Sequence, residues 1–211
     1  MQAMLDTIEQ HAKHYLPGPI DPAVMMALQK TPRELFGGDY QDHPCPIGFQ
    51  QTISQPFMVA MMSAMIYRLS TQHEHVLEIG SGSGYQSAVL AQLYAQVTGI
   101  ERIEALAAAS IISIQALALN NINIIHQNAF YPVKNQAKFD AILVACGVYA
   151  QLPPVWVEQL SEQGVLLVPF AESANDSMQL CVWQKQQGQL QPLATGLSQP
   201  LYCNFVPFIN P

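Results

Sequence analysis

Hydrophobic and polar positions follow two different patterns along the chain. Before residue 70, apolar residues recur at helical spacing, which predicts helices over residues 2–15, 22–30 and 54–69. From residue 74, short apolar runs alternate with helical stretches. The expected strands cover residues 75–79, 97–100, 122–126, 140–145 and 165–169, and the expected helices between them cover residues 84–94, 103–119 and 154–160. Such alternation is typical of a doubly wound parallel sheet with helices on both faces.

The two ends of the chain depart from this alternation. Residues 178–184 and 189–195 predict an antiparallel hairpin, and residues 204–208 predict a last strand. Residues 1–53 predict a helical extension that packs on the core formed by residues 54–211. The sequence therefore predicts an α/β fold with a mostly parallel sheet, an N-terminal helical extension and antiparallel C-terminal strands.

A long loop over residues 37–53 is expected between the N-terminal helices and the rest of the chain. It is rich in Gly, Pro and Asp, and loops of this length inside a compact domain usually carry function. Thr31 before the loop is followed directly by a proline, and Ser54 after it stands two residues before one. Because side-chain oxygens in this position cap helices, we expect both residues to be helix caps.

Three glycines at alternate positions, Gly80, Gly82 and Gly84, follow the strand expected at residues 75–79. Glycine permits positive φ and lets a ligand approach the backbone closely. The helix that starts there offers free N–H groups to anionic or hydrogen-bonding ligand groups. The pattern indicates a nucleotide-like cofactor at the carboxyl end of a parallel strand.

Two acidic residues narrow the choice of cofactor. Glu101 ends the next expected strand, where an acidic side chain commonly accepts hydrogen bonds from ribose hydroxyls, although it could also simply favour a helix N-terminus. Nicotinamide dinucleotides and S-adenosylmethionine share this layout. Glu78 would repel a pyrophosphate and attract the ammonium of a methionine moiety, and the sequence has no Tyr-x-x-x-Lys pair. These features favour S-adenosylmethionine.

Composition excludes several other partners. Charged residues make up 11% of the chain and the net charge is −7 without a Lys/Arg cluster, so we expect no nucleic-acid partner and no anionic membrane partner. No apolar run has the length of a membrane span, and no signal peptide is apparent. The four cysteines and six histidines form no metal motif. We therefore expect a cytoplasmic protein with free thiols and no metal site.

Residues 42–56 closely resemble the N-terminal signature of the protein-L-isoaspartate O-methyltransferases, whose Pro-Ile-Gly-x-x-Gln/Ala-Thr-Ile-Ser-x-Pro segment precedes the cofactor domain. Residues 31–36 are similar to the family's Pro-Arg-Glu-x-Phe, residues 76–90 to its cofactor motif, and residues 205–208 to its closing strand. The resemblance spans about residues 20–209. It implies a Rossmann-like methyltransferase domain.

The resemblance also implies an activity, which is repair of damaged proteins. Such an enzyme transfers a methyl group from S-adenosylmethionine to the free carboxylate of an isoaspartyl residue and releases S-adenosylhomocysteine. A carboxylate with a pKa of about 4 is already ionised at pH 7, so the reaction needs no general base. Catalysis is then a matter of desolvating the carboxylate and aligning it with the methyl group.

The motif and the resemblance together assign the candidate site residues. Ser54 and Thr52 are the catalytic candidates, since hydroxyl groups suit the task of holding a carboxylate. The expected cofactor contacts are Glu78, Gly80, Ser81, Gly82, Gly84, Glu101, Arg102, Asn128 and Ala129. The expected substrate contacts are Ile47, Gly48, Ile53 and Val206.

Two segments depart from the family pattern. Residues 127–130 read Gln-Asn-Ala-Phe where the family has Gly-Asp-Gly and an aromatic residue, and residues 145–150 replace a Thr-Ala-Ala type segment. Asn128 can accept a hydrogen bond from an adenine amine, but without charge. These departures keep two alternatives open: a methyltransferase fold with another acceptor, and a non-catalytic cofactor-binding or interaction protein.

The stretch from residue 105 to residue 133 contains no Asp, Glu, Lys or Arg. A helix that flanks a doubly wound sheet normally has a charged outer face. We therefore expect the helix over Ile103–Leu119 to contact a partner or to form a homodimer with a second copy of the chain.

Overall fold

The computed structural model describes residues 1–134 and 136–209, so the last two residues of the expected core domain, 210 and 211, lie outside it. Its main sheet has the order β10-β9-β8-β6-β3-β4-β5, with β7 paired to β8. The strands are β3 (His75–Ile79), β4 (Gln96–Glu101), β5 (Ile122–His126), β6 (Phe139–Val144), β7 (Val148–Tyr149), β8 (Leu160–Ala171), β9 (Gln179–Gln186) and β10 (Gln189–Pro192). Within the order β8-β6-β3-β4-β5, all neighbouring strands are parallel. Strand β9 is antiparallel to β8, and β10 is antiparallel to β9. The expected α/β fold is confirmed.

The strand order creates the place for a ligand. From β3 the chain moves outward through β4 to β5, and it then returns to β6 on the other side of β3. In open α/β sheets, ligands bind beyond the carboxyl ends of the strands where the order reverses in this way. The segments that follow β3, β4, β5 and β6 therefore meet at one edge of the sheet.

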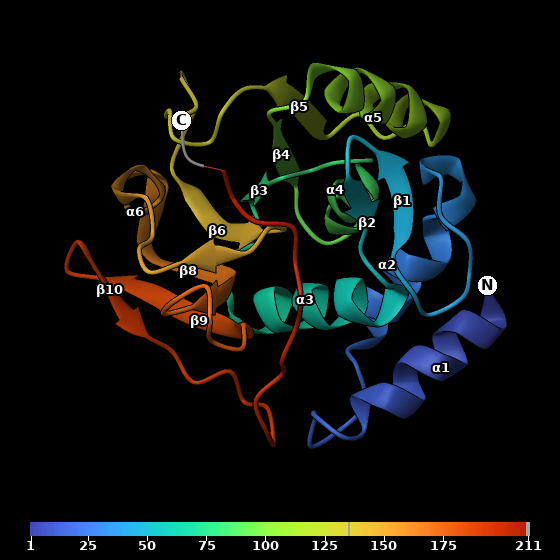
Figure 1. Cartoon of the computed structure of the whole chain (residues 1–211), viewed down its shortest axis with the longest axis horizontal. Coiled ribbons are helices and arrows are strands. Elements are labelled where there is room, and N and C mark those ends of the chain that lie inside the picture. Colours follow the sequence, from blue (N-terminus) through green and yellow to red (C-terminus); the bar gives the residue numbers. More distant parts are fainter. Residues whose placement is uncertain (135, 210–211) are drawn as a thin grey trace.

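Helices cover both faces of the sheet, as expected (Figure 1). The helices of the first face are α1 (Gln2–Ala12), α2 (Pro22–Lys30), α3 (Pro56–Leu69), α4 (Tyr85–Leu90) and α5 (Glu104–Ala116), which all contribute to one hydrophobic core. Helix α6 (Pro154–Gln159) contributes Trp156 to the second core on the other face. Among these described helices, none is both long and apolar enough to cross a membrane.

The N-terminal extension packs directly on α3. Helices α1 and α2 share the core of α3, whose residues from Pro56 to Ile66 are all buried. A 3-10 helix, η1 (Arg33–Phe36), follows α2 and buries the Arg33 guanidinium against the ring of Tyr85, 5.1 Å from its centroid. We propose on these contacts that residues 1–53 and the core fold as one unit.

Thr31 does not cap η1 as expected. Its hydroxyl donates to the carbonyl of Ala27 at 2.8 Å, within the last turn of α2. The free carbonyls of a helix end lie within reach of a threonine at that position, so its side chain stays with the preceding helix.

The loop expected over residues 37–53 contains a β-hairpin, so the expectation of a loop was wrong for its second half. Strands β1 (Cys45–Gly48) and β2 (Gln51–Ile53) pair antiparallel around Phe49 and Gln50. Both turn residues have positive φ, 53° and 58°. This turn could not be predicted from the sequence, because residues other than Gly, Asn and Asp seldom adopt that conformation.

The prediction that Ser54 caps α3 is also wrong. The N-cap position belongs to Gln55, and the side chain that serves the helix end is Asp42, whose Oδ1 accepts from the Phe57 N–H at 2.8 Å. The other oxygen of Asp42 lies 3.0 Å from Nδ1 of His11 on α1. Within the described part of the chain, the Ser54 hydroxyl forms no hydrogen bond, so it remains available to a ligand.

Residues 204–208 do not form the expected strand. The tail is held instead by isolated bridges, Gly147 with Pro207 and Gln179 with Tyr202. Pro207 lacks an N–H group and so cannot continue a ladder. In Figure 1 the tail leaves the β9–β10 hairpin, passes α3 and returns to the carboxyl edge of the sheet.

The shared use of Asp42 predicts a stability effect. Replacing Asp42 with Ala removes the cap of α3 and the contact with His11, which should lower the free energy of unfolding by about 1–2 kcal/mol. Urea unfolding of the variant measures this, with Glu9→Ala on the exposed face of α1 as the control. Unfolding at the wild-type midpoint would show that Asp42 does not hold α3.

Candidate active site

A cavity of about 470 Å³ opens at the carboxyl edge of the parallel strands, within the size range of small-molecule sites. Four strand ends contribute to it: Gly80 follows β3, Glu101 ends β4, Asn128 follows β5 and Cys146 follows β6. The cavity therefore occupies the position that the strand order provides for a ligand.

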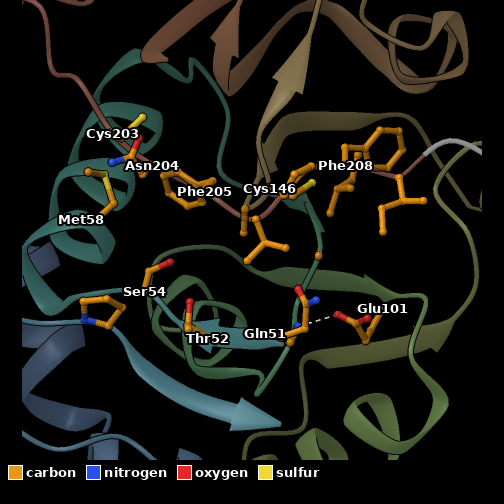
Figure 2. A pocket seen from close by; sticks show the side chains of 18 of the residues that line it. Gln51, Thr52, Ser54, Met58, Glu101, Cys146, Cys203, Asn204, Phe205 and Phe208 are labelled. Atoms are coloured by element: carbon orange, nitrogen blue, oxygen red, sulfur yellow. Dashed lines mark hydrogen bonds between the residues drawn. The ribbon is translucent and has the colours of Figure 1, made fainter. Parts of the chain in front are cut away.

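Two segments from the ends of the chain form the opposite walls. One is the end of the β1–β2 hairpin and the entry to α3, with Thr52 and Ser54; the other is the tail over residues 201–209. Figure 2 shows Met58 and Cys203 toward one end of the cavity, Glu101 and Phe208 toward the other, and Thr52 and Ser54 on its floor. We call the Glu101 side the strand end and the Met58 side the helix end.

Glu101 is held at the strand end by two backbone N–H groups. Its Oε2 accepts from the N–H of Gly82 at 2.9 Å and its Oε1 accepts from the N–H of Ile103 at 2.8 Å. The side chain is 6% exposed. Because a carboxylate has about four acceptor positions, both oxygens can still accept from ligand hydroxyls. Glu101 thus serves the start of α5 and the cavity at the same time.

The glycine turn has the conformation that its sequence predicts. The φ angles of Gly80, Gly82 and Gly84 are 82°, 51° and 84°. Gly80 and Gly82 line the cavity. Gly84 does not, and a Cβ there would stand 3.0 Å from the Cβ of Ser110 on α5. Gly84 therefore allows helix packing, and the first two glycines allow a ligand to approach.

A smaller hollow of about 40 Å³ adjoins the cavity and shares Thr52, Ser54, Gly80 and Gly82 with it. Glu78 and Ser81 lie in this hollow, and both are buried. Among the described residues, Oε1 of Glu78 and Oγ of Ser81 have no hydrogen-bond partner. Oη of Tyr85, which also lines the hollow, is a third such atom. Unpaired buried polar atoms suit the charged groups of an amino-acid moiety.

The protonation of Glu78 depends on what occupies the hollow. Burial raises the pKa of Glu78 to about 8, and the hydrogen bond from the Ser87 hydroxyl offsets this only in part. Without a cation nearby, the carboxyl group is therefore mostly protonated at pH 7. A ligand ammonium would favour the charged form.

Asn128 lines the strand end, and its side-chain oxygen already accepts one hydrogen bond. Its Oδ1 accepts from the N–H of Phe130 at 3.0 Å, which fixes the orientation of the amide. The NH₂ group and the second lone pair of the oxygen are left for a ligand. Asn128 therefore offers a donor as well as the expected acceptor. The neighbouring Ala129 is buried, and its carbonyl accepts from the Trp156 indole at 2.9 Å.

Of the remaining expected contacts, four line the cavity or the hollow and two do not. Arg102, Ala129 and Val206 line the main cavity, and Ile53 lines the small hollow. Ile47 and Gly48 line neither; Ile47 instead stands behind the glycine turn, 3.3 Å from where a Cβ on Gly82 would be.

Several lining residues had no signal in the sequence. Tyr15, Met58, Tyr202 and Asn204 lie in the cavity wall, but nothing in their local pattern separates them from ordinary packing residues. Cys146 also lines the cavity. Burial raises the pKa of its thiol well above the ordinary value, so the group stays protonated and is not a nucleophile at neutral pH.

Comparison with known proteins identifies the family. The family model for protein-L-isoaspartate(D-aspartate) O-methyltransferase matches residues 8–209. A protein-L-isoaspartate O-methyltransferase from Shewanella denitrificans is 40% identical over 174 residues, covering 80% of this chain and 81% of the relative. Another from Trichlorobacter lovleyi is 38% identical over 195 residues, covering 90% and 86%. The chain belongs to the protein-L-isoaspartate(D-aspartate) O-methyltransferase family.

Solved structures agree with this fold. A Plasmodium falciparum chain crystallised in complex with S-adenosyl-L-homocysteine superposes with a TM-score of 0.82 at 24% identity and covers 99% of this chain and 97% of its own. A second structure, a protein-L-isoaspartate O-methyltransferase, gives a TM-score of 0.80 at 21% identity, covering 98% of this chain and 65% of its own. The fold is that of this family throughout its described length.

The two segments that depart from the family pattern both border the cavity. Gln127, Asn128 and Ala129 line its strand end, and Ala145 and Cys146 line it after β6. Beyond them, β7 pairs with β8, and Gly147 exchanges hydrogen bonds with the tail at Val206 and Phe208. The departures thus fall on the site and on the support of the tail.

The buried carboxyl group of Glu78 predicts a pH-dependent stability. Its pKa is raised from 4.5 to about 8 in the folded chain, so the folded state holds this proton more tightly. The free energy of unfolding should therefore fall as pH rises from about 4.5 to about 8, by up to about 1.4 kcal/mol per pH unit.

Glu78→Gln removes this titration and keeps the size of the side chain. Chemical unfolding at pH 6, 7 and 8, without cofactor, should show the variant gaining stability over the wild type as pH rises. The exposed Glu172→Gln serves as the control. A constant difference between Glu78→Gln and wild type across this range would contradict the raised pKa.

Proposed function

We propose that the chain is a protein-L-isoaspartate O-methyltransferase, which methylates the free carboxylate of isoaspartyl residues in damaged proteins with S-adenosylmethionine as the donor. Family membership supports the activity. The observation that carries it at the site is one continuous cavity with Glu101 at the strand end and the free Ser54 hydroxyl toward the helix end. A donor and an acceptor can therefore meet inside it.

The strand end suits the cofactor. We assign the ribose hydroxyls to the carboxylate of Glu101, the adenine to the region of Asn128 and Ala129, and the amino-acid moiety to the small hollow with Glu78 and Ser81. When bound, S-adenosylmethionine supplies an activated methyl group on a positively charged sulfonium. The protein groups here bind and orient; none of them has to exchange a proton with the methyl donor.

The hydroxyls of Thr52 and Ser54 suit the acceptor carboxylate. Each can donate one hydrogen bond to it and so fix the direction of its remaining lone pairs. At the N-terminus of α3, Asp42 already accepts from the Phe57 N–H, and the two hydroxyls add donors beside this helix start. Of the described lining residues, only Arg102 is a Lys or Arg, and it follows β4 at the strand end.

Other expectations about partners stay predictions. On α5, Ile112 is 70% exposed and Ile111 is 39% exposed, which agrees with the proposal that this helix contacts a second copy of the chain. The cytoplasmic location is likewise a prediction from the sequence.

The activity is tested by methyl transfer from labelled S-adenosylmethionine to an isoaspartyl peptide and to its aspartyl twin. We expect label only in the isoaspartyl peptide. Ser54→Ala should lower kcat/KM by roughly 10- to 100-fold, because it removes a hydrogen bond to a charged group. Ser113→Ala on α5 is the control. Cofactor binding without transfer to either peptide would favour another acceptor or a non-catalytic role.

The assignment of the adenine to Asn128 predicts a change in affinity for S-adenosylmethionine. In Asn128→Asp, one carboxylate oxygen keeps the Phe130 N–H and the other becomes free to accept from the adenine amine. Since charge-assisted hydrogen bonds are about twice as strong as neutral ones, affinity for S-adenosylmethionine should rise several-fold. Calorimetric titration measures it, and Asn123→Asp on β5 adds the same charge outside the cavity. An equal or weaker affinity for Asn128→Asp would refute the assignment of the adenine.

A further inference from the structure

The helix end of the cavity extends beyond Ser54 into a wall of apolar and aromatic side chains. We call it the flank wall; it consists of Tyr15, Phe57, Met58, Leu201, Tyr202 and Cys203. Tyr15 follows α1, Phe57 and Met58 belong to the first turn of α3, and the other three belong to the tail. In Figure 2, Met58 and Cys203 stand on the far side of Ser54 from Glu101. None of the groups assigned to the cofactor belongs to this wall.

The flank wall is built as a fixed unit. The ring centroids of Tyr15 and Phe57 lie 5.8 Å apart, and His11 packs edge-on against Phe57 at 5.6 Å. The tail is tied to the end of α1, where the Ser198 N–H donates to the carbonyl of Tyr15 at 2.7 Å.

The tail is also tied to the sheet. The N–H of Leu180 donates to the carbonyl of Leu201 at 3.0 Å, and the N–H of Cys203 donates to the carbonyl of Met178 at 2.9 Å. The wall therefore does not have to form around a ligand, and a ligand side chain loses little free energy to ordering it.

Exposure differs along the wall. Phe57, Met58, Leu201 and Cys203 are buried, whereas Tyr202 is 62% exposed although it lines the cavity. Tyr202 therefore stands at the mouth. A substrate chain that places its carboxylate at Ser54 and leaves the cavity past this ring brings a neighbouring side chain against the wall.

Charge decides which side chain fits. The flank wall has no Lys, Arg, Asp or Glu, and the nearby carboxylate of Asp42 is occupied by His11 and the Phe57 N–H. Asn204, which Figure 2 shows beside Cys203, is a neutral amide, so a charged side chain would lose hydration there without gaining an opposite charge. An aromatic ring would cover apolar surface and stack on the tyrosines.

We infer that the flank wall is a specificity subsite, which takes an apolar, above all aromatic, side chain adjacent to the isoaspartyl residue of the substrate. The inference rests on the proposed function. It adds to that function a preference among damaged sites: those next to Phe, Tyr, Trp or Leu are methylated before those next to Lys or Glu.

The test uses isoaspartyl peptides that differ only at the residue directly before or directly after the isoaspartate, which is Gly, Phe, Lys or Glu. We expect kcat/KM for Phe to exceed that for Gly by about tenfold at one of the two positions, because partial burial of a ring is worth about one power of ten. Lys and Glu at the same position should fall below Gly. Equal values for Gly and Phe at both positions would overturn the subsite.

Variants locate the preference on the wall, with the Phe-to-Gly ratio of kcat/KM within each variant as the readout. Tyr202→Ala and Tyr15→Ala should bring this ratio close to one. Tyr131→Ala, which removes a tyrosine that is 59% exposed and outside the cavity, should keep the wild-type ratio. A wild-type ratio in both Tyr202→Ala and Tyr15→Ala would overturn the assignment.

The outcomes separate the two proposals. Measurable kcat/KM values that are equal for all the isoaspartyl peptides would support the methyltransferase activity and overturn the subsite. Failure to methylate any isoaspartyl peptide, the Gly-flanked ones included, overturns the activity and the subsite together.

Discussion

The carboxylate of Glu101 joins two strand ends, and the geometry of the site depends on that link. It accepts N–H groups from Gly82 and from Ile103, so the glycine turn after β3 and the start of α5 after β4 are held to the same side chain. A buried carboxylate with two such bonds has little freedom to move. The backbone positions that face a cofactor are therefore set by a residue that also faces it, and a change at Glu101 disturbs both.

The donor and acceptor sides of the cavity come from different parts of the chain. Parallel strand ends form the donor side, and their positions follow from sheet topology. The acceptor side is assembled from the β1–β2 hairpin, the start of α3 and the tail. A few hydrogen bonds hold these segments in place: Asp42 accepts from the start of α3, and Tyr15 and Gly147 bond to the tail. This division places specificity in segments that can change without altering the sheet.

The sequence predicted the parts of the fold that depend on local pattern. Strands β3 and β5 and helix α2 begin and end at the expected residues, because apolar runs there are bounded by Gly, Pro or Asn. It missed the β1–β2 hairpin, whose turn uses Phe49 and Gln50 with positive φ. It also missed the cap of α3, since Asp42 lies 15 residues from the N–H that it accepts. The flank wall could not be predicted for the same reason: only the tertiary fold brings Tyr15 and Tyr202 to the same cavity.

We propose that one cavity holds both reactants, with the cofactor ribose on Glu101 and the acceptor carboxylate on Thr52 and Ser54. A crystal structure of the chain with S-adenosylhomocysteine and an isoaspartyl peptide would show both contacts. We expect ribose hydroxyls within hydrogen-bond distance of the Glu101 carboxylate and the isoaspartyl carboxylate within that distance of the Ser54 hydroxyl. A ribose bound away from Glu101, or a peptide carboxylate bound outside this cavity, would refute the proposed arrangement.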